Sequence, residues 1–235
     1  MINNAARGVV MVVLLAIAGC TYRPGADNPV ARSLSWFSYA GAADLRAACQ
    51  PGSPDRMRLI YNGKYDEQIR SYDVAALAAG SGFDGGTVEV RIRGVKDLSK
   101  GLELFDLFAA WRADGRLIRI SGSQTAALRR ALDDSGLLRP VQGGIRLNSL
   151  EFYWLASACL DGKFTVNAWK YPSERFEALR FPPVLLKLDP TGPEINPPRP
   201  YNQFVDQEGD RNIDFGFDFK VEDNRLAGAS AAFGS

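Results

Sequence analysis

The 235-residue sequence predicts an α+β fold that is rich in strands, with a mostly antiparallel sheet and a few short helices in one domain. Residues Thr87–Arg93 alternate between apolar and polar side chains, which is the period of a half-buried strand. Two Asp-Gly dipeptides, at 114–115 and 161–162, separate strand-like runs and indicate hairpins. Only one stretch, 123–135, has the full pattern of a longer helix.

The first elements of the body follow from composition and alternation. Alanine-rich Gly41–Cys49 predicts a short helix that ends before Pro51-Gly52. Arg56–Asn62 alternates as a strand does, and Tyr65–Tyr72 is its expected hairpin partner across Gly63-Lys64.

The central region predicts two hairpins with a helix between them. The Asp-Gly dipeptides join the runs 107–113 with 116–121 and 150–160 with 163–171. Ser121 and Gln124 have capping-box spacing, and Gly136 can close the helix that they begin.

The last third of the sequence is rich in proline. Seven of the thirteen prolines lie in 182–200, which predicts an extended surface excursion containing at most a short strand, Val184–Leu188. Two interpretations stay open, a docking arm for a partner and a stiffened crossover loop. Ile213–Val221 alternates again and predicts a strand with an aromatic inner face.

Composition excludes several classes of function. The chain has no histidine, so Ser-His-Asp and Cys-His catalysis and histidine-ligated zinc are excluded. Its 28 basic and 27 acidic side chains nearly balance, and no basic run exceeds Arg129-Arg130. Nucleic-acid binders carry a basic excess, so no nucleic-acid partner is expected.

The N-terminus has the pattern of an export signal. Met1–Arg7 carries one positive charge, and apolar Gly8–Ala18 is too short for a transmembrane helix, which needs about 20 residues. Ile17-Ala18-Gly19-Cys20 resembles the lipobox of bacterial lipoproteins.

This resemblance implies a signal peptide over 1–19 and a Cys20 that carries acyl chains and binds the lipid bilayer. A flexible tether, 20–33, would then join the membrane to a globular domain, 34–235. Thr21 stands where an Asp would retain a lipoprotein at the inner membrane, which favours an outer-membrane location facing the periplasm.

Cys49 and Cys159 remain once Cys20 is lipidated. An even pair in an oxidising compartment predicts a disulfide, although two separately buried thiols are the alternative.

Motifs for catalysis, nucleotides and metals are weak. Residues 80–85 match GxGxxG but precede a strand instead of a helix, so they indicate a glycine-rich turn. The acidic run 206–214 lacks the glycine and glutamate of an EF-hand, which leaves open only another kind of calcium site. We find no GxSxG, SxxK, P-loop or CxxC motif, and we expect no catalytic residue, resident metal or cofactor.

One group of aromatic and acidic side chains could form a glycan cleft. Its members are Glu151, Trp154, Asp161, Trp169 and Tyr171, with Glu174 and Glu177 nearby. Aromatic side chains on strands equally suit a core. We therefore expect a non-catalytic envelope lipoprotein that works through a protein partner; the alternative is a glycan or small-ligand binder, or a carboxylate-based glycan hydrolase.

Overall fold

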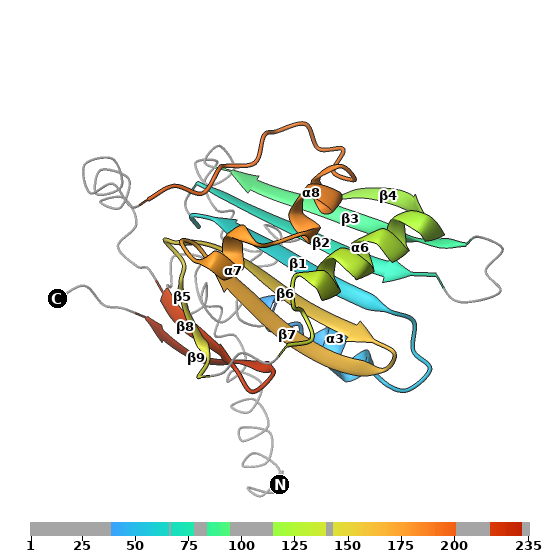
Figure 1. The fold of residues 1–235 in the computed structure, drawn as a ribbon, viewed down its shortest axis with the longest axis horizontal. Coiled ribbons are helices and arrows are strands. Elements are labelled where there is room, and N and C mark those ends of the chain that lie inside the picture. Colours follow the sequence, from blue (N-terminus) through green and yellow to red (C-terminus); the bar gives the residue numbers. More distant parts are fainter. Residues whose placement is uncertain are drawn as a thin grey trace, which may run out of the picture.

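A computed structural model describes residues 39–65, 67–77, 84–94, 115–139, 143–200 and 217–231. They form an α+β fold that is rich in strands, in which one antiparallel sheet is the largest element (Figure 1). The predicted fold class is therefore confirmed.

The main sheet has six antiparallel strands in the order β4-β3-β2-β1-β6-β7. The bounds are β1 Arg56–Gly63, β2 Gln68–Ala76, β3 Gly85–Gly94, β4 Arg116–Ser121, β6 Phe152–Leu160 and β7 Lys163–Lys170. The expected hairpin of β1 with β2 is present, with β2 beginning at Gln68. The pairing of β1 with β6 joins strands that are far apart in the sequence.

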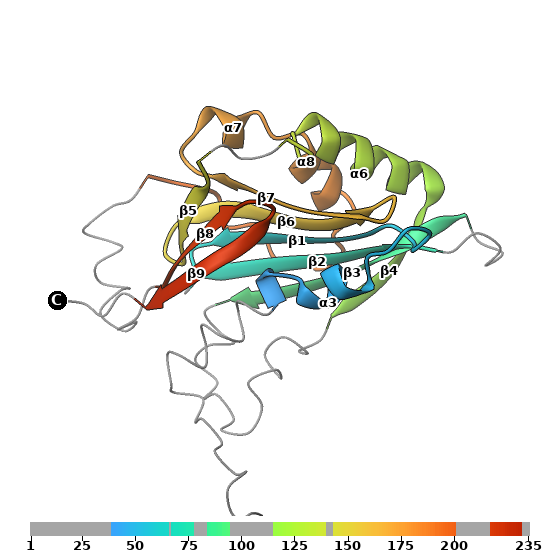
Figure 2. The same cartoon turned by 90° about the horizontal axis from the view of Figure 1, so that it is seen from below.

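Other elements cover both faces of this sheet (Figure 2). On one face lie α6 (Gly122–Asp134), α7 (Glu174–Glu177) and α8 (Phe181–Leu186). The opposite face carries α3 (Ala43–Ala48) and a small sheet of β5 (Ile145–Asn148), β8 (Phe217–Glu222) and β9 (Arg225–Ala231). Strand β6 lies between these layers and is buried along its whole length, which explains its nearly continuous apolar sequence.

Aromatic side chains fill the core on the helix side. Phe181 packs edge-on against Trp154, with 5.1 Å between ring centroids, and lies 5.3 Å from Trp169. On the other side Tyr153 meets Phe219, an inner-face residue of β8, at 5.8 Å. Residues 213–216 of the strand predicted over Ile213–Val221 lie outside the described part.

The hairpin of β6 and β7 confirms the second Asp-Gly prediction. Asp161 and Gly162 both have positive φ, 49° and 71°, as a tight two-residue turn between antiparallel strands requires. A Cβ at Gly162 would lie 2.6 Å from Pro51 Cα, so the turn has no room for a side chain.

The first Asp-Gly prediction is only partly described, because residues 107–113 lie outside the described part. Strand β4 pairs with β3. The predicted helix is present as α6, with the Ser121–Gln124 capping box formed and Gly136 at φ 80° after its last turn.

The strand predicted over Val184–Leu188 is wrong, because this run lies largely in helix α8. Pro182 and Pro183 occupy the first turn, where no amide donor is needed, and Phe181 and Leu185 bury one helical face. A short apolar run does not distinguish a strand from a buried helix by periodicity. Residues 187–200 have no regular secondary structure beyond a turn, and we call them the strap.

A disulfide joins Cys49, at the end of α3, to Cys159 in β6, as predicted. The Cα atoms are 5.5 Å apart, and the bond links positions separated by 110 residues. It fastens the end of α3 to β6.

We predict that reduction of this disulfide lowers the free energy of unfolding by up to about 4 to 5 kcal/mol, because the bridge closes a long loop in the unfolded chain. Urea unfolding of a Cys20→Ser protein, with and without dithiothreitol, measures the loss. Thiol titration of the same protein, unfolded without reductant, should find no free thiol. Two free thiols would contradict the bridge.

Candidate functional site

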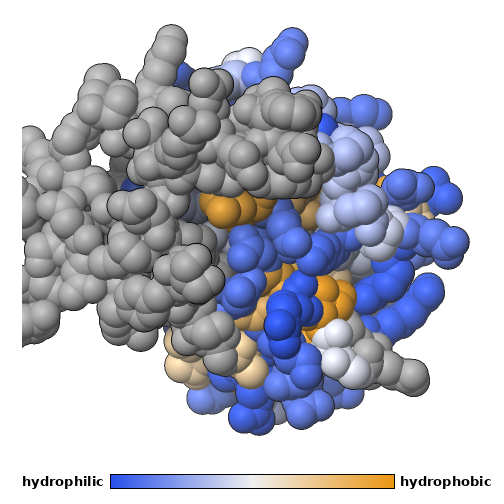
Figure 3. Space-filling model, turned by 90° about the vertical axis from the view of Figure 1, so that its left-hand side faces the viewer, coloured by the Kyte–Doolittle hydropathy of each residue, from blue (hydrophilic) through white to orange (hydrophobic). Residues whose placement is uncertain are grey.

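A pocket lies at the end of the main sheet where β1 and β7 finish, with a cavity volume of about 340 Å³. Its walls come from four segments that are far apart in the sequence: Lys64, the stretch 150–152, the stretch 170–172, and residues 199–200 of the strap. Figure 3 views this end of the molecule, where hydrophilic side chains surround small apolar areas. The volume lies within the range of small-ligand sites.

Two aromatic rings form part of the pocket lining. Phe152 and Tyr171 meet edge-on, with 6.5 Å between centroids, and a backbone hydrogen bond of 2.9 Å from the Tyr171 amide to the Phe152 carbonyl fixes their separation. Behind Tyr171, the ring of Phe176 from α7 packs at 5.5 Å. Tyr171 is half-buried and presents an aromatic surface to the cavity.

The loop before β6 is held by a buried asparagine. Asn62 donates from its amide nitrogen to the carbonyls of Ser149, at 2.8 Å, and Glu151, at 2.5 Å. The Tyr65 amide donates to the Ser149 carbonyl at 2.8 Å. These bonds fix the wall that carries Leu150 and Glu151.

Among the described residues, three cations and one carboxylate line the pocket. Lys170 forms an ion pair with Glu151 at 2.8 Å, and both side chains are more than a third exposed, at 37% and 36%. Arg199 stacks over Phe152 with 5.2 Å from its guanidinium carbon to the ring centroid. Lys64, the third cation, is almost fully buried.

Glu67, behind the pocket wall, orients two of these cations. Its carboxylate accepts hydrogen bonds from both terminal nitrogens of Arg199, at 2.9 and 2.5 Å, and lies 3.7 Å from the Lys64 ammonium. Burial would raise the pKa of Glu67, but the bonds from Arg199 and Asn196 outweigh it and lower that pKa. Glu67 is therefore ionised near neutral pH.

A buried ion pair holds the strap to β2. Arg70 meets Asp189 at 2.6 Å, and the side chains are only 2% and 4% exposed. Tyr72 donates to the same carboxylate at 2.8 Å, and the Thr191 amide donates to it at 2.9 Å. Burial would raise the pKa of Asp189, but the bonds from Thr191, Tyr72 and Arg70 lower it.

Further hydrogen bonds continue this attachment along the strap. Gln68 donates to the Glu194 carbonyl at 2.9 Å and accepts from the Asn196 amide at 2.8 Å. Tyr61 donates to the Asn196 carbonyl at 2.6 Å, and the Asn196 side chain donates to Gly63 at 2.7 Å. The path of the strap, and with it the place of Arg199, is thus fixed by the sheet.

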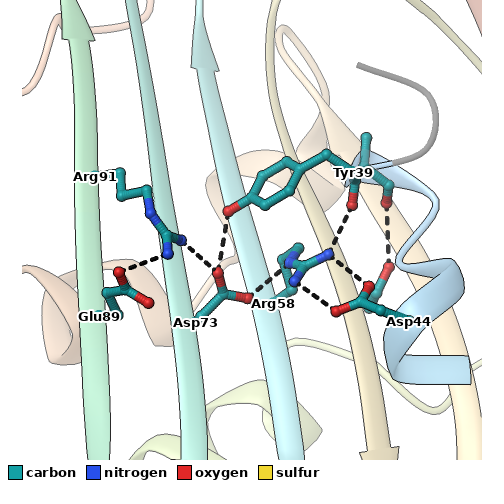
Figure 4. Close-up of polar contacts among 8 residues, drawn as sticks. Tyr39, Asp44, Arg58, Asp73, Glu89 and Arg91 are labelled. Carbon is teal, nitrogen blue, oxygen red and sulfur yellow. Dashed lines mark hydrogen bonds and ion pairs between the residues drawn. The ribbon is translucent and has the colours of Figure 1, made fainter. Parts of the chain in front are cut away.

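A second polar cluster lies on the opposite sheet face (Figure 4). Arg58 donates to Asp73 at 2.6 Å and to both oxygens of Asp44, at 2.9 and 3.0 Å, and its guanidinium lies 4.2 Å from the Tyr39 ring centroid. Arg91 also donates to Asp73, at 2.8 Å. Burial, together with Asp73, raises the pKa of Tyr39 to about 12. This cluster fastens α3 and the residues before it to β1 and β2.

Of the five residues predicted to bind a ligand, the structure brings two to the pocket and places three elsewhere. Glu151 and Tyr171 line the pocket. Trp154 and Trp169 are 2% and 1% exposed and belong to the core, so neither offers a surface for stacking. Asp161 lies in the turn at the far end of the β6–β7 hairpin, about 30 Å away at 3.3 Å per residue, and pairs there with Arg129.

Glu174 and Glu177 lie exposed on α7. Sequence reasoning missed Arg199, because its contact with Glu67 joins positions 132 residues apart, and it missed Lys64 and Lys170, because charged residues are usually solvated surface groups. No local signal marks them.

Residues 80–83 of the glycine-rich turn and the acidic run 206–214 lie outside the described part. Within the described ranges, no group of three or more His, Cys, Asp or Glu could hold a metal ion. No helix among the described residues is long and apolar enough to cross a membrane. The chain matches no known protein-family model, and no curated protein resembles it.

We predict that Asp189→Asn lowers the free energy of unfolding by about 3 to 5 kcal/mol at pH 7, because it leaves the Arg70 charge buried without its partner. The lowered pKa of Asp189 means that its contribution is complete above about pH 3.9 and is lost as the pH falls further. The variant and the unmodified protein should therefore converge below that pH.

Urea unfolding at several pH values between 7 and 3 measures this difference. Exposed Asp134→Asn serves as the control, with an expected change within about 0.5 kcal/mol at pH 7. An Asp189→Asn protein as stable as the control would show that the ion pair does not hold the strap.

Proposed function

We propose that this protein is a lipid-anchored, non-catalytic binding protein of the bacterial cell envelope. In this proposal acylated Cys20 holds it at the outer membrane, facing the periplasm, and the pocket beside Tyr171 takes a glycan segment or another small ligand. The pocket itself is the observation that carries the binding function.

Two independent features support the compartment. The N-terminal pattern ending in Cys20 resembles the lipobox of bacterial lipoproteins. The Cys49–Cys159 disulfide fits an oxidising compartment such as the periplasm, since disulfides are rare in reducing cytosol.

The chemistry of the pocket supports binding over hydrolysis. An aromatic surface next to a few fixed polar groups is the usual composition of a small-ligand site. Glycoside hydrolysis generally requires two carboxyl groups about 5 to 9.5 Å apart on either side of the bond. Among the described residues that line the pocket, Glu151 is the only carboxylate, and it is paired with Lys170.

The strap favours a second candidate function, contact with an envelope protein partner. It is fixed to the sheet by the buried Arg70–Asp189 ion pair and by hydrogen bonds, yet prolines are exposed along it, namely Pro190, Pro193, Pro197 and Pro200. A proline-rich surface that is already ordered loses little conformational entropy when a partner binds.

We predict that Tyr171→Ala abolishes ligand binding, because it removes the aromatic wall of the pocket. Thermal unfolding with and without envelope glycan fragments tests this, since a ligand that binds only the folded state raises the midpoint temperature. Tyr22→Ala, in the predicted tether, is the matched control and should keep the shift. Equal shifts in both variants would place binding elsewhere, and a flat response across fragments would favour the protein-contact function.

We also predict that Cys20→Ser releases the protein from membranes. Fractionation of cells that express each form measures the change, and a mild-detergent pull-down from the same membranes tests for a stoichiometric partner. Equal membrane retention of the two forms would contradict lipid anchoring.

A further inference from the structure

The charges around the pocket restrict what it can bind. Of the four charged side chains that the described residues contribute to its lining, three are cations: Lys64, Lys170 and Arg199. With Glu67 behind the wall included, cations still outnumber carboxylates among the described residues at this site. A concave surface with this balance attracts anions.

The three cations differ in how available they are to a ligand. Arg199 is held by two bonds to Glu67 and by stacking on Phe152, so its place is set before any ligand arrives. Among the described residues, Lys170 forms an ion pair with Glu151 alone, and both side chains are more than a third exposed. Exposed ion pairs contribute little stability, about 1 kcal/mol or less. The Lys170–Glu151 pair can therefore open at small cost, so an anionic ligand can compete with Glu151 for Lys170.

The apolar part of the lining restricts the ligand further. Leu150, Phe152, Tyr171, Pro172 and Pro200 supply an apolar and aromatic surface next to the charges. A ring with one apolar face fits this surface, and a negative group on its edge would then reach Lys170.

On this basis we propose that the pocket recognises an acidic saccharide, in which a pyranose ring packs on Tyr171 and its carboxylate pairs with Lys170. The inference rests on the proposed binding function and specifies the ligand class of the same pocket. Binding replaces one carboxylate by another at Lys170 and involves no covalent step.

Glucuronic acid and glucose are a matched pair of probes, because they share one ring and differ in a carboxylate against a hydroxymethyl group. Each is titrated into the full-length protein in mild detergent, and binding is followed by saturation-transfer NMR. We expect glucuronic acid to bind about two- to fivefold more tightly than glucose, with the advantage shrinking as salt is added.

Lys170→Gln should weaken glucuronic acid binding about two- to fivefold, the factor that corresponds to about 1 kcal/mol or less, and leave glucose binding unchanged, because only the acidic probe uses the charge. Lys163→Gln, at the exposed start of the same strand, is the matched control and should change neither. Equal affinity for the two probes would overturn the acidic-saccharide inference and leave the binding function standing. Binding of neither probe at about 10 mM would also overturn the acidic-saccharide inference, whereas the binding function is tested separately by the thermal shifts with envelope glycan fragments.

Discussion

The buried ion pair between Arg70 and Asp189 is the contact on which the pocket depends. A buried ion pair is tolerated when its remaining polar atoms are also hydrogen-bonded. Here the Tyr72 hydroxyl and the Thr191 amide donate hydrogen bonds to the Asp189 carboxylate. The pair joins positions 119 residues apart and so determines where the chain runs after α8. Arg199 lies further along the same strap, and its place follows from this attachment.

Strand β6 explains how the rest of the chain is organised around that contact. Its two faces are both covered, by α6 and α8 on one side and by α3 and the small sheet on the other. On the α3 side, the disulfide and Arg58 fix the N-terminal part of the domain. On the helix side, Tyr61 and Tyr72 pack near Trp154 while their hydroxyls bond the strap. The core and the polar attachment of the strap are therefore built from the same residues.

Features governed by local chemistry could be predicted from the sequence. The Asp161-Gly162 turn and the Ser121 capping box depend on neighbouring residues, and both are present. Helix α8 could not be distinguished from a strand, because the burial of Phe181 and Leu185 depends on tertiary packing. Of the site, Glu151 and Tyr171 could be named from their residue types.

The remaining site residues could not be predicted, for a physical reason. Arg199 reaches the pocket only because the strap and Glu67 bring distant segments together. Lys64 lies just after β1, and a charged residue in such a place is usually a solvated surface group. Trp154 and Trp169 were candidates because of their residue type. They are buried between the sheet and the helices instead, where their large apolar area stabilises the folded state.

The exposure of the charged side chains distinguishes those that hold the pocket walls in place from those that are available to a ligand. Arg70 and Asp189 are 2% and 4% exposed, so replacing either partner leaves a buried charge, and the pair is fixed. Lys170 and Glu151 are 37% and 36% exposed, so water can compensate either partner when the pair opens. A binding site requires both kinds: fixed contacts that hold its walls, and exchangeable contacts that a ligand can replace. The end of the sheet beside Tyr171 has both: the buried Arg70–Asp189 pair that holds the strap, and the exposed Lys170–Glu151 pair that a ligand can open.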